Sequence, residues 1–399
     1  MSWNYVTLDK LGSVSRGKSK HRPRNDTSLF GGKYPFIQTA DVKAAGLYLT
    51  EYTETYSDKG LSQSKLWPAG TLCITIAANI ADTTILGIDA CFPDSVMGFI
   101  PYEGVSNVKF VKYAFDILQR ECKKISQGTA QDNLSWKKLS TIKFPAPDIE
   151  VQDRIVNILS AYDDLIENNQ KQIKLLEEAA QRLYKEWFVD LRFPGYDDVK
   201  IVDGVPEGWK YKLVSDFGEV ITGKTPSTSK DDYYGGNIPF VTIPDMHGKI
   251  YPLITEKTLT KLGADTQKNK YLPANSVIIS CIATVGLVNI AVEPCQTNQQ
   301  INSVILNNEE DLYFFYESML RIKALLDGVG SNGATMTNVN KTKFSNIKVL
   351  YPTNDLIIKY KNFCLPIFEK ILALAKSVIK IEHARDGLLP KMMSGEIEV

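Results

Sequence analysis

The chain repeats itself about 205 residues apart, so any fold it adopts must hold two similar halves. The repeat preserves the order of glycine, aromatic and charged residues: Trp3, Tyr5, Gly12, Gly17 and Lys18 recur as Trp209, Tyr211, Gly218, Gly223 and Lys224. A duplicated fold presents two similar surfaces about a pseudo-twofold axis, which suits a partner that is itself repeated or two-sided. Duplex DNA is the commonest partner of that kind.

Length and composition are those of an ordinary globular protein. The 399 residues can form two to four domains, and 44% are hydrophobic and 23% charged. The apolar stretches are too short to span a bilayer, and the six cysteines form no CxxC pair. We therefore expect a cytoplasmic protein with reduced thiols and no membrane partner.

The charges are segregated along the chain, although the formal net charge is zero. Between Lys10 and Arg24 there are six basic residues and no acid, and between Lys109 and Lys143 eight basic residues meet three acids. Asp148–Asp190 instead holds ten acids and five basic residues. The pattern predicts basic patches on one kind of module and an acidic surplus on another.

Each half is predicted to be a strand-rich block followed by a long helix. The strand-rich blocks span 1–148 and 209–352, the helices span 149–190 and 353–393, and a loop at 191–208 joins the halves. Expected strands are Leu72–Ala77, Thr83–Ile88, Ile142–Phe144, Pro239–Ile243, Val277–Cys281 and Val285–Val292, and expected shorter helices are Val111–Ile125 and Leu312–Leu326. The predicted fold class is α+β.

Apolar residues in both long helices step alternately by four and three, as in a coiled coil. The seam consists of Ile155, Leu159, Tyr162, Ile166, Ile173, Leu176 and Leu183 in the first helix and Ile367, Ile371, Leu374, Val378, Ile381 and Leu388 in the second. We expect the helices to pair antiparallel. Asn169 either sets the register opposite Leu or Val or lies at a water-accessible edge, and Pro366 either kinks the second helix or marks its beginning.

No catalytic constellation is present in the sequence. There is no GxxxxGK[ST] loop, convincing GxGxxG, GxSxG or HExxH, and the three histidines lack metal-ligand spacing. The Asn/Asp-Pro-Pro-aromatic signature of an amino-methyltransferase is also missing. The sequence therefore predicts a non-catalytic binding protein without a metal or cofactor of its own.

An ordered set of motifs resembles the DNA-specificity subunit of type I restriction-modification systems, over nearly the whole chain. The motifs are Trp3–Gly12, Gly128–Leu134, Leu183–Asp190, Trp209–Gly218, Thr222–Pro226, Thr284–Gly286, Thr297–Asn302 and Leu388–Glu396. The first half departs from the pattern at Pro93–Gly98, where the second half has Thr297–Asn302. That departure is expected if the two halves read different DNA sequences.

The resemblance implies that each strand-rich block is a target-recognition domain for one half of a bipartite, double-stranded DNA target. It implies that the helix pair is a spacer, on which two methyltransferase subunits dock to methylate adenine. Restriction and motor subunits are further implied partners. S-adenosylmethionine and ATP would then be bound by those partners and not by this chain.

Two other classes of function remain open from the sequence. A stand-alone repressor built from two fused half-site readers would be soluble and would bind DNA tightly by itself. A coiled-coil scaffold with two ligand-binding domains would not account for the basic clusters. A specificity subunit should instead expose apolar and acidic helix surface and improve in behaviour with its methyltransferase.

Candidate DNA contacts are Arg, Lys, Asn, Gln and hydroxyl side chains on loops of the strand-rich blocks. In the first block they are Arg16, Lys18, Lys20, Arg22, Arg24, Gln127, Thr129, Gln131 and Asn133. In the second they are Lys224, Thr225, Ser227, Lys230, Tyr233, Asn332 and Asn338. The alternative is that the first basic loop is merely solvated and that Gln127–Asn133 is a satisfied turn.

Overall fold

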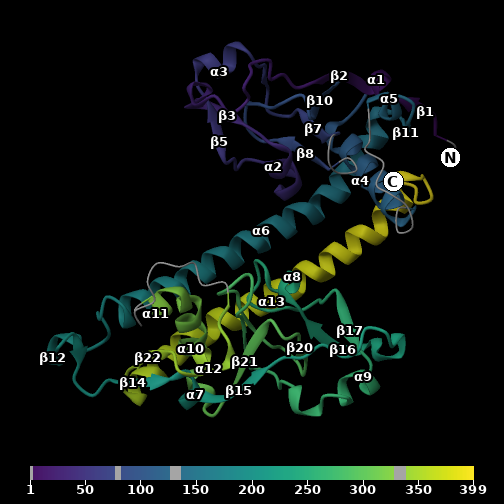
Figure 1. The fold of residues 1–399 in the computed structure, drawn as a ribbon. Helices are drawn as coiled ribbons and strands as arrows, with labels where there is room; N and C mark the ends of the chain where they lie inside the picture. Colours follow the sequence, from purple (N-terminus) through teal and green to yellow (C-terminus); the bar gives the residue numbers. More distant parts are fainter. Residues whose placement is uncertain (1–2, 77–81, 126–135, 328–337) are drawn as a thin grey trace. The chain divides into compact units, whose positions relative to one another are not determined.

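The computed structural model describes residues 3–76, 82–125, 136–327 and 338–399. Its contacts divide the chain into two compact units. Unit 1 contains the residues up to Asn168 together with Val378–Val399, and unit 2 contains Asn169–Ser377. The long helices α6 (Ile149–Phe188) and α13 (Asn354–Met393), drawn in Figure 1, each run for 40 residues and contribute one part to each unit. The boundary between the units therefore falls within both helices.

In its described residues, unit 1 contains three sheets and several helices. The five-stranded sheet has the order β2 (Gly12–Arg16), β10 (Val96–Pro101), β7 (Leu72–Thr75), β8 (Thr83–Leu86) and β4 (Tyr48–Leu49). The four-stranded sheet has the order β5 (Glu54–Tyr56), β3 (Phe30–Phe36), β9 (Ala90–Cys91) and β6 (Leu66–Trp67), and β1 (Tyr5–Thr7) pairs with β11 (Lys143–Pro145). The helices are α1 (Leu8–Leu11), α2 (Thr39–Ala44), α3 (Asp58–Ser62), α4 (Val108–Ile125) and α5 (Trp136–Leu139).

Unit 2 repeats this arrangement. One sheet has the order β15 (Gly218–Thr222), β21 (Ile301–Leu306), β18 (Val277–Ser280) and β19 (Val288–Ile290), and another has the order β17 (Lys257–Leu259), β16 (Tyr234–Val241) and β20 (Gln296–Thr297). Strand β14 (Lys210–Leu213) pairs with β22 (Lys348–Tyr351), and β12 (Ile201–Val202) pairs with β13 (Val205–Pro206) in a hairpin. Its helices are α7 (Val214–Phe217), α8 (Ile243–Met246), α9 (Lys261–Asp265), α10 (Leu312–Leu320), α11 (Ile322–Asp327) and α12 (Lys341–Ser345). The order β2-β10-β7-β8 matches β15-β21-β18-β19, so the duplication extends to strand order.

The predicted fold class is confirmed: two strand-rich domains accompany two long helices that pack together. Three details of the sequence analysis are corrected. The helix expected at Leu312–Leu326 is two helices, because α10 ends before Arg321 and α11 begins after it. Pro366 does not mark the beginning of its helix; α13 begins at Asn354 and continues through the proline.

Helix α13 continues through Pro366 because the residues near the proline on the buried face of the helix pack into the core. Cys364 and Phe368 are fully buried, whereas Pro366 is exposed. The helix therefore lacks a backbone N–H donor only on its solvent side.

The third correction concerns the loop that differs between the halves. In the strand pairing, Met97 lies opposite Arg16 and Asn302 lies opposite Thr222. The residues equivalent to Thr297–Asn302 are therefore 92–97, one position earlier than the sequence comparison indicated.

The seam residues of both helices lie in the hydrophobic cores. Ile155, Leu159, Ile166, Ile371, Leu374 and Val378 are buried, and Tyr162, Ile173, Leu176, Leu183, Ile367, Ile381 and Leu388 are half-buried. In unit 1 the seam packs against α4, and in unit 2 it joins an aromatic cluster around Phe188, Phe314 and Tyr360. Asn169 faces Ser377, with 3.4 Å between Nδ2 and Oγ, and not the Leu or Val that was expected.

In the part of the chain that the structure describes, no helix is both long and apolar enough to cross a membrane.

Candidate nucleic-acid interface

The basic loop of unit 1 begins at a close crossing of two backbone segments. The Gly17 amide donates to the carbonyl oxygen of Val96 at 2.8 Å, and the Lys18 amide donates to that of Phe92 at 3.0 Å. A Cβ atom on Gly17 would collide with the carbonyl oxygen of Pro93. Glycine is required here by the close approach of the two segments.

Unit 2 contains the same crossing. The Gly223 amide donates to the carbonyl oxygen of Ile301 at 3.0 Å, and the Lys224 amide donates to that of Thr297 at 2.9 Å. A Cβ atom on Gly223 would collide with the carbonyl oxygen of Asn298. The repeated Gly-Lys pair is therefore part of the scaffold, and the loop after it projects from the same place in each unit.

Two of the predicted basic contacts in unit 1 have partners within the chain. The Arg22 guanidinium donates to the carbonyl oxygens of Ser19 and His21, both at 2.8 Å, so it braces its own loop. The Arg24 guanidinium donates to both carboxylate oxygens of Asp94, at 2.9 and 3.0 Å. Of the other predicted basic contacts, Lys18 is half-buried and Arg16 and Lys20 are exposed.

The same loop is ordered by the carboxylate of Asp26. Hydrogen bonds from the Ser28 hydroxyl and amide, and then the ammonium of Lys59, hold the pKa of Asp26 well below its usual range. The His21 Nε2 atom lies 2.8 Å from this carboxylate. The loop therefore has a defined course despite its charge.

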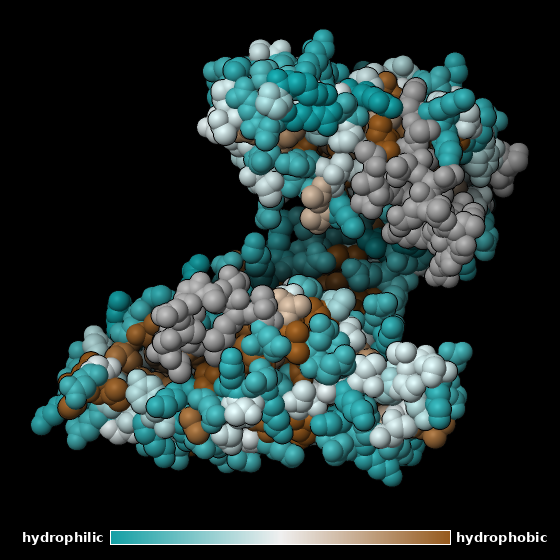
Figure 2. Space-filling view, viewed as in Figure 1, coloured by the Kyte–Doolittle hydropathy of each residue, from teal (hydrophilic) through white to brown (hydrophobic). Residues whose placement is uncertain are grey.

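Beside this loop lies a groove of about 710 Å³ at the edge of the β5-β3-β9-β6 sheet. Phe36 and Tyr56 form its floor, stacked with ring centroids 4.0 Å apart, and burial raises the pKa of Tyr56. Arg24, Gln38 and Glu54 also line the groove, and Gln38 Nε2 donates to Glu54 Oε2 at 2.7 Å. On the face drawn in Figure 2, the surface of this strand-rich domain is mostly hydrophilic.

The equivalent loop of unit 2 is held by neutral groups. Thr225 Oγ1 donates to Gln299 Oε1 at 2.7 Å, and Gln267 Nε2 donates to the backbone carbonyl oxygen of Lys224 at 2.6 Å. The side chain of Lys224 is exposed. Gln299 of unit 2 thus pairs with a neutral threonine, whereas its equivalent in unit 1, Asp94, pairs with Arg24.

Further along this loop, the predicted contacts lie close to one another. Ser227 and Ser229 share a hydrogen bond of 2.9 Å between their hydroxyls. Lys230 Nζ donates to the Tyr233 hydroxyl at 3.1 Å, and this hydrogen bond raises the pKa of the exposed Lys230. Asn338 is exposed and forms an antiparallel bridge with Ile282.

Five predicted contacts lie outside the described residues. They are Gln127, Thr129, Gln131, Asn133 and Asn332. Their role in DNA binding remains a prediction.

The sequence analysis missed Gln38 and Glu54 because they are 16 residues apart and neither belongs to a basic cluster. The repeat held the only signal for this site. Phe36 and Asp41 recur in the second half, whereas Gln38 between them is replaced.

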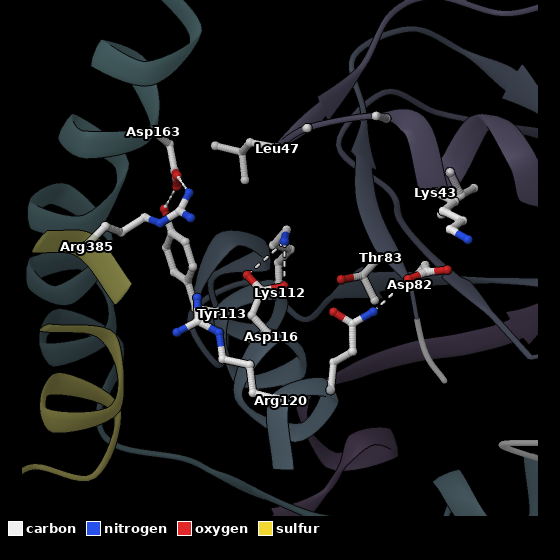
Figure 3. A pocket seen from close by; sticks show the side chains of 14 residues that line it. Lys43, Leu47, Asp82, Thr83, Lys112, Tyr113, Asp116, Arg120, Asp163 and Arg385 are labelled. Carbon is white, nitrogen blue, oxygen red and sulfur yellow. Dashed lines mark hydrogen bonds and ion pairs between the residues drawn. The ribbon is translucent and has the colours of Figure 1, made fainter. Parts of the chain in front are cut away.

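A second hollow in unit 1, of about 280 Å³, is lined mainly by polar and charged side chains (Figure 3). They come from α4, α6 and α13 and from residues 42–47 and 82–83. The Arg385 guanidinium donates to Asp163 Oδ1 at 2.6 Å, and the Tyr113 hydroxyl donates to Asp163 Oδ2 at 2.5 Å. Lys112 pairs with Asp116 at 2.6 Å, and burial raises the pKa of that aspartate. Because these cations already have carboxylate partners, we assign them to structure and not to DNA contact.

Metal-ligating side chains show no grouping in the described residues. Within 3–76, 82–125, 136–327 and 338–399, no three His, Cys, Asp or Glu residues are arranged to hold a metal ion.

The chain matches the family model described as the type I restriction modification DNA specificity domain over residues 2–178 and 206–356. It is 33% identical over 330 residues to the type I restriction enzyme HindI specificity subunit of Haemophilus influenzae, covering 66% of this chain and 71% of that protein. It is 26% identical over 415 residues to the MjaIX specificity subunit of Methanocaldococcus jannaschii, covering 100% of this chain and 94% of that protein.

The fold has a counterpart among solved structures. The S subunit of a type I restriction-modification system from M. genitalium aligns with a TM-score of 0.58 and 15% identity, covering 98% of this chain and 96% of that one. At this identity the likeness shows the fold alone. Together with the family match over most of the sequence, these findings show that the chain belongs to the type I restriction-modification DNA specificity subunits.

Proposed function

We propose that the chain reads a bipartite DNA target with one half-site per unit and directs methyltransferase subunits to methylate adenine there. The chain itself supplies position and specificity. S-adenosylmethionine and ATP are bound by partner subunits in this proposal, and restriction subunits join the complex through the same partners. The helix pair acts as the spacer between the half-sites.

The observation that carries the proposal is one scaffold with two different sets of polar side chains. In unit 1, Phe36 lies opposite Glu54 across the β3–β5 pair; in unit 2, Phe240 lies opposite Lys257 across the β16–β17 pair. Both pairs contain a register shift before this point. Equal backbones with unequal side chains suit two half-sites of different sequence, because base edges are distinguished by their hydrogen-bonding groups.

Apolar residues exposed at equivalent places in the two units support a partner that binds the chain in two copies. Tyr5 in β1 is 55% exposed and Tyr211 in β14 is 60% exposed. On the helices, Ile158 of α6 is 39% exposed and Phe363, 205 residues later on α13, is 57% exposed. Exposed aromatic side chains are typical of protein interfaces, and their duplication favours two copies of one partner.

The proposal is tested by co-expressing the chain with a type I methyltransferase subunit and mapping methylated adenines in the host DNA. We expect two short motifs at one fixed spacing, methylated only when this chain is present. A Tyr5→Ser and Tyr211→Ser double variant should weaken assembly of the complex, and a variant at the exposed Tyr102 is the matched control.

Two outcomes would contradict the proposal. A stable complex with unchanged methylation would remove the directing role. Tight sequence-specific binding by the chain alone, without any complex, would favour the stand-alone DNA-binding protein.

A further inference from the structure

The backbone that follows strand β3 in unit 1 and strand β16 in unit 2 is capped in the same way. In unit 1 the Gln38 amide donates to Asp41 Oδ2 at 2.8 Å, and in unit 2 the Thr242 amide donates to Asp245 Oδ2 at 2.8 Å. Each aspartate lies in the first turn of a short helix that follows the strand. The repeated aspartates are therefore structural, and the positions around them can be compared residue by residue.

Side-chain chemistry is reversed at the position opposite the repeated phenylalanine. Unit 1 has Glu54 opposite Phe36, and unit 2 has Lys257 opposite Phe240. A carboxylate only accepts hydrogen bonds and an ammonium only donates them. Since the backbone is the same, the difference lies in what each unit offers to a ligand.

In unit 1 this position works together with Gln38. Gln38 is exposed, Glu54 is half-buried, and the bond from Gln38 Nε2 to Glu54 Oε2 holds both side chains in the lining of the groove. This bond uses one carboxylate oxygen of Glu54, and the other oxygen is a further acceptor in the lining of the groove. The pair therefore favours a base whose major-groove edge carries an amino group, which is adenine N6 or cytosine N4.

In unit 2 the residue equivalent to Gln38 does not extend toward a ligand. The Thr242 hydroxyl donates to Asp245 Oδ2 at 2.7 Å, so the short side chain is used within the helix cap. Lys257 is exposed and is the charged donor at this position. A lone ammonium favours guanine, whose O6 and N7 are both acceptors.

We propose that Gln38 with Glu54, and Lys257 in the other unit, are equivalent specificity-determining side chains. The first reads an adenine or cytosine of one half-site, and the second reads a guanine of the other. This inference rests on the proposed function, in which the two units read DNA.

The test is an exchange variant, Gln38→Thr with Glu54→Lys, which gives unit 1 the side chains of unit 2. The variant and the unchanged chain, each in complex with methyltransferase subunits, are used to select binders from randomised duplex DNA. We expect one position of one half-site to change from adenine or cytosine to guanine, with the other half-site unchanged. Affinity for the original target should fall on the order of 10- to 100-fold.

Matched variants separate base reading from a general charge effect. Glu103→Lys makes the same charge change as Glu54→Lys at an exposed residue of unit 1 that does not line the groove, and it should leave the motif unchanged. Lys257→Glu should change only the other half-site. If the exchange variant does not fold, Glu54→Gln keeps the shape of the side chain and should reduce the preference at the same single position.

The outcomes distinguish this inference from the proposed function. A folded exchange variant that selects the original motif with affinity within about twofold overturns the inference alone, since a lost base contact costs about fivefold or more. An unchanged chain that selects no motif in its complex overturns both.

Discussion

At equivalent positions of the helix pair, the two units have opposite kinds of side chain. In unit 1, Asp163 of α6 forms an ion pair with Arg385 of α13. The equivalent residues of unit 2, 205 positions away, are Phe368 and Ala180, both fully buried. Phe368 stacks on Tyr313 with ring centroids 4.4 Å apart.

The difference follows from what surrounds each position. Asp163 and Arg385 line the 280 Å³ hollow of unit 1, so their ion pair lies among further charged side chains such as Lys112 and Asp116. Phe368 has no exposed surface at all. Equivalent positions of the duplicated helices thus carry an ion pair in unit 1 and buried apolar side chains in unit 2, according to the elements that surround them.

The largest effect is expected from Phe368→Ala. Removing a fully buried aromatic ring should cost unit 2 about 3–5 kcal/mol. Amide hydrogen exchange, followed by mass spectrometry on peptides of each unit, would assign the loss to unit 2. Phe363→Ala on the same helix is the control, because Phe363 is more than half exposed; an equal loss in both variants would contradict this account.

The next effect is the pH dependence of unit 2. Burial, and then repulsion from Glu177, raises the pKa of Glu317 to about 8, with Arg321 opposing the shift. The protonated carboxyl contributes stability that is fully present below about pH 4.5, its ordinary value, and is lost as the pH rises through 8. The slope within this window approaches about 1.4 kcal/mol per pH unit.

This pH effect is measured by chemical unfolding at pH 5.5, 7 and 8.5. Glu317→Gln should remove the fall in stability, and Glu219→Gln, at an exposed strand position, should keep it. An unchanged pH profile in Glu317→Gln would show that another group is responsible.

A smaller effect is expected from Asp163→Ala in unit 1. The change leaves Tyr113 without its acceptor, but Arg385 retains Asp386 at 3.0 Å, so the cost should be about 1–3 kcal/mol. The double variant Asp163→Phe with Arg385→Ala gives unit 1 the residues of unit 2. Since apolar residues often replace buried ion pairs without loss, it should recover stability in thermal unfolding. A double variant less stable than Asp163→Ala would show that the hollow requires charge.

The smallest effect is expected from Asn169→Leu, which introduces the residue found at the equivalent position, Leu374. The 3.4 Å bond to Ser377 is long, so the free energy of unfolding should change by at most about 1 kcal/mol. If Asn169 sets the helix register, the variant would instead lose amide protection along both long helices.

The repeat and the heptads predicted the two strand-rich blocks and the long helices because both signals can be read from the order of residues along the chain. The α10–α11 break at Arg321 escaped prediction, since the apolar residues run on across it. The course of α13 through Pro366 excludes one of the two predicted alternatives, that the proline marks the beginning of the helix. Burial of Cys364 and Phe368 overrides the local signal of proline.

The candidate site was predicted only in part. Arg24 was identified from its charge and lies in the groove. The Arg22 side chain instead donates to backbone carbonyl oxygens of its own loop. Gln38 and Glu54 meet through the pairing of β3 with β5, a contact that no composition or spacing signals.

The sequence by itself determined the duplication, the long helices and their seam, because each depends on residues a few positions apart or on residues that recur in the same order. Only the tertiary structure decided which polar side chains share a groove and which charges are neutralised within the chain. Those outcomes depend on strand pairing and on side chains that arrive from distant segments. Equal backbones in the two units therefore came to carry an acceptor at Glu54 and a donor at Lys257.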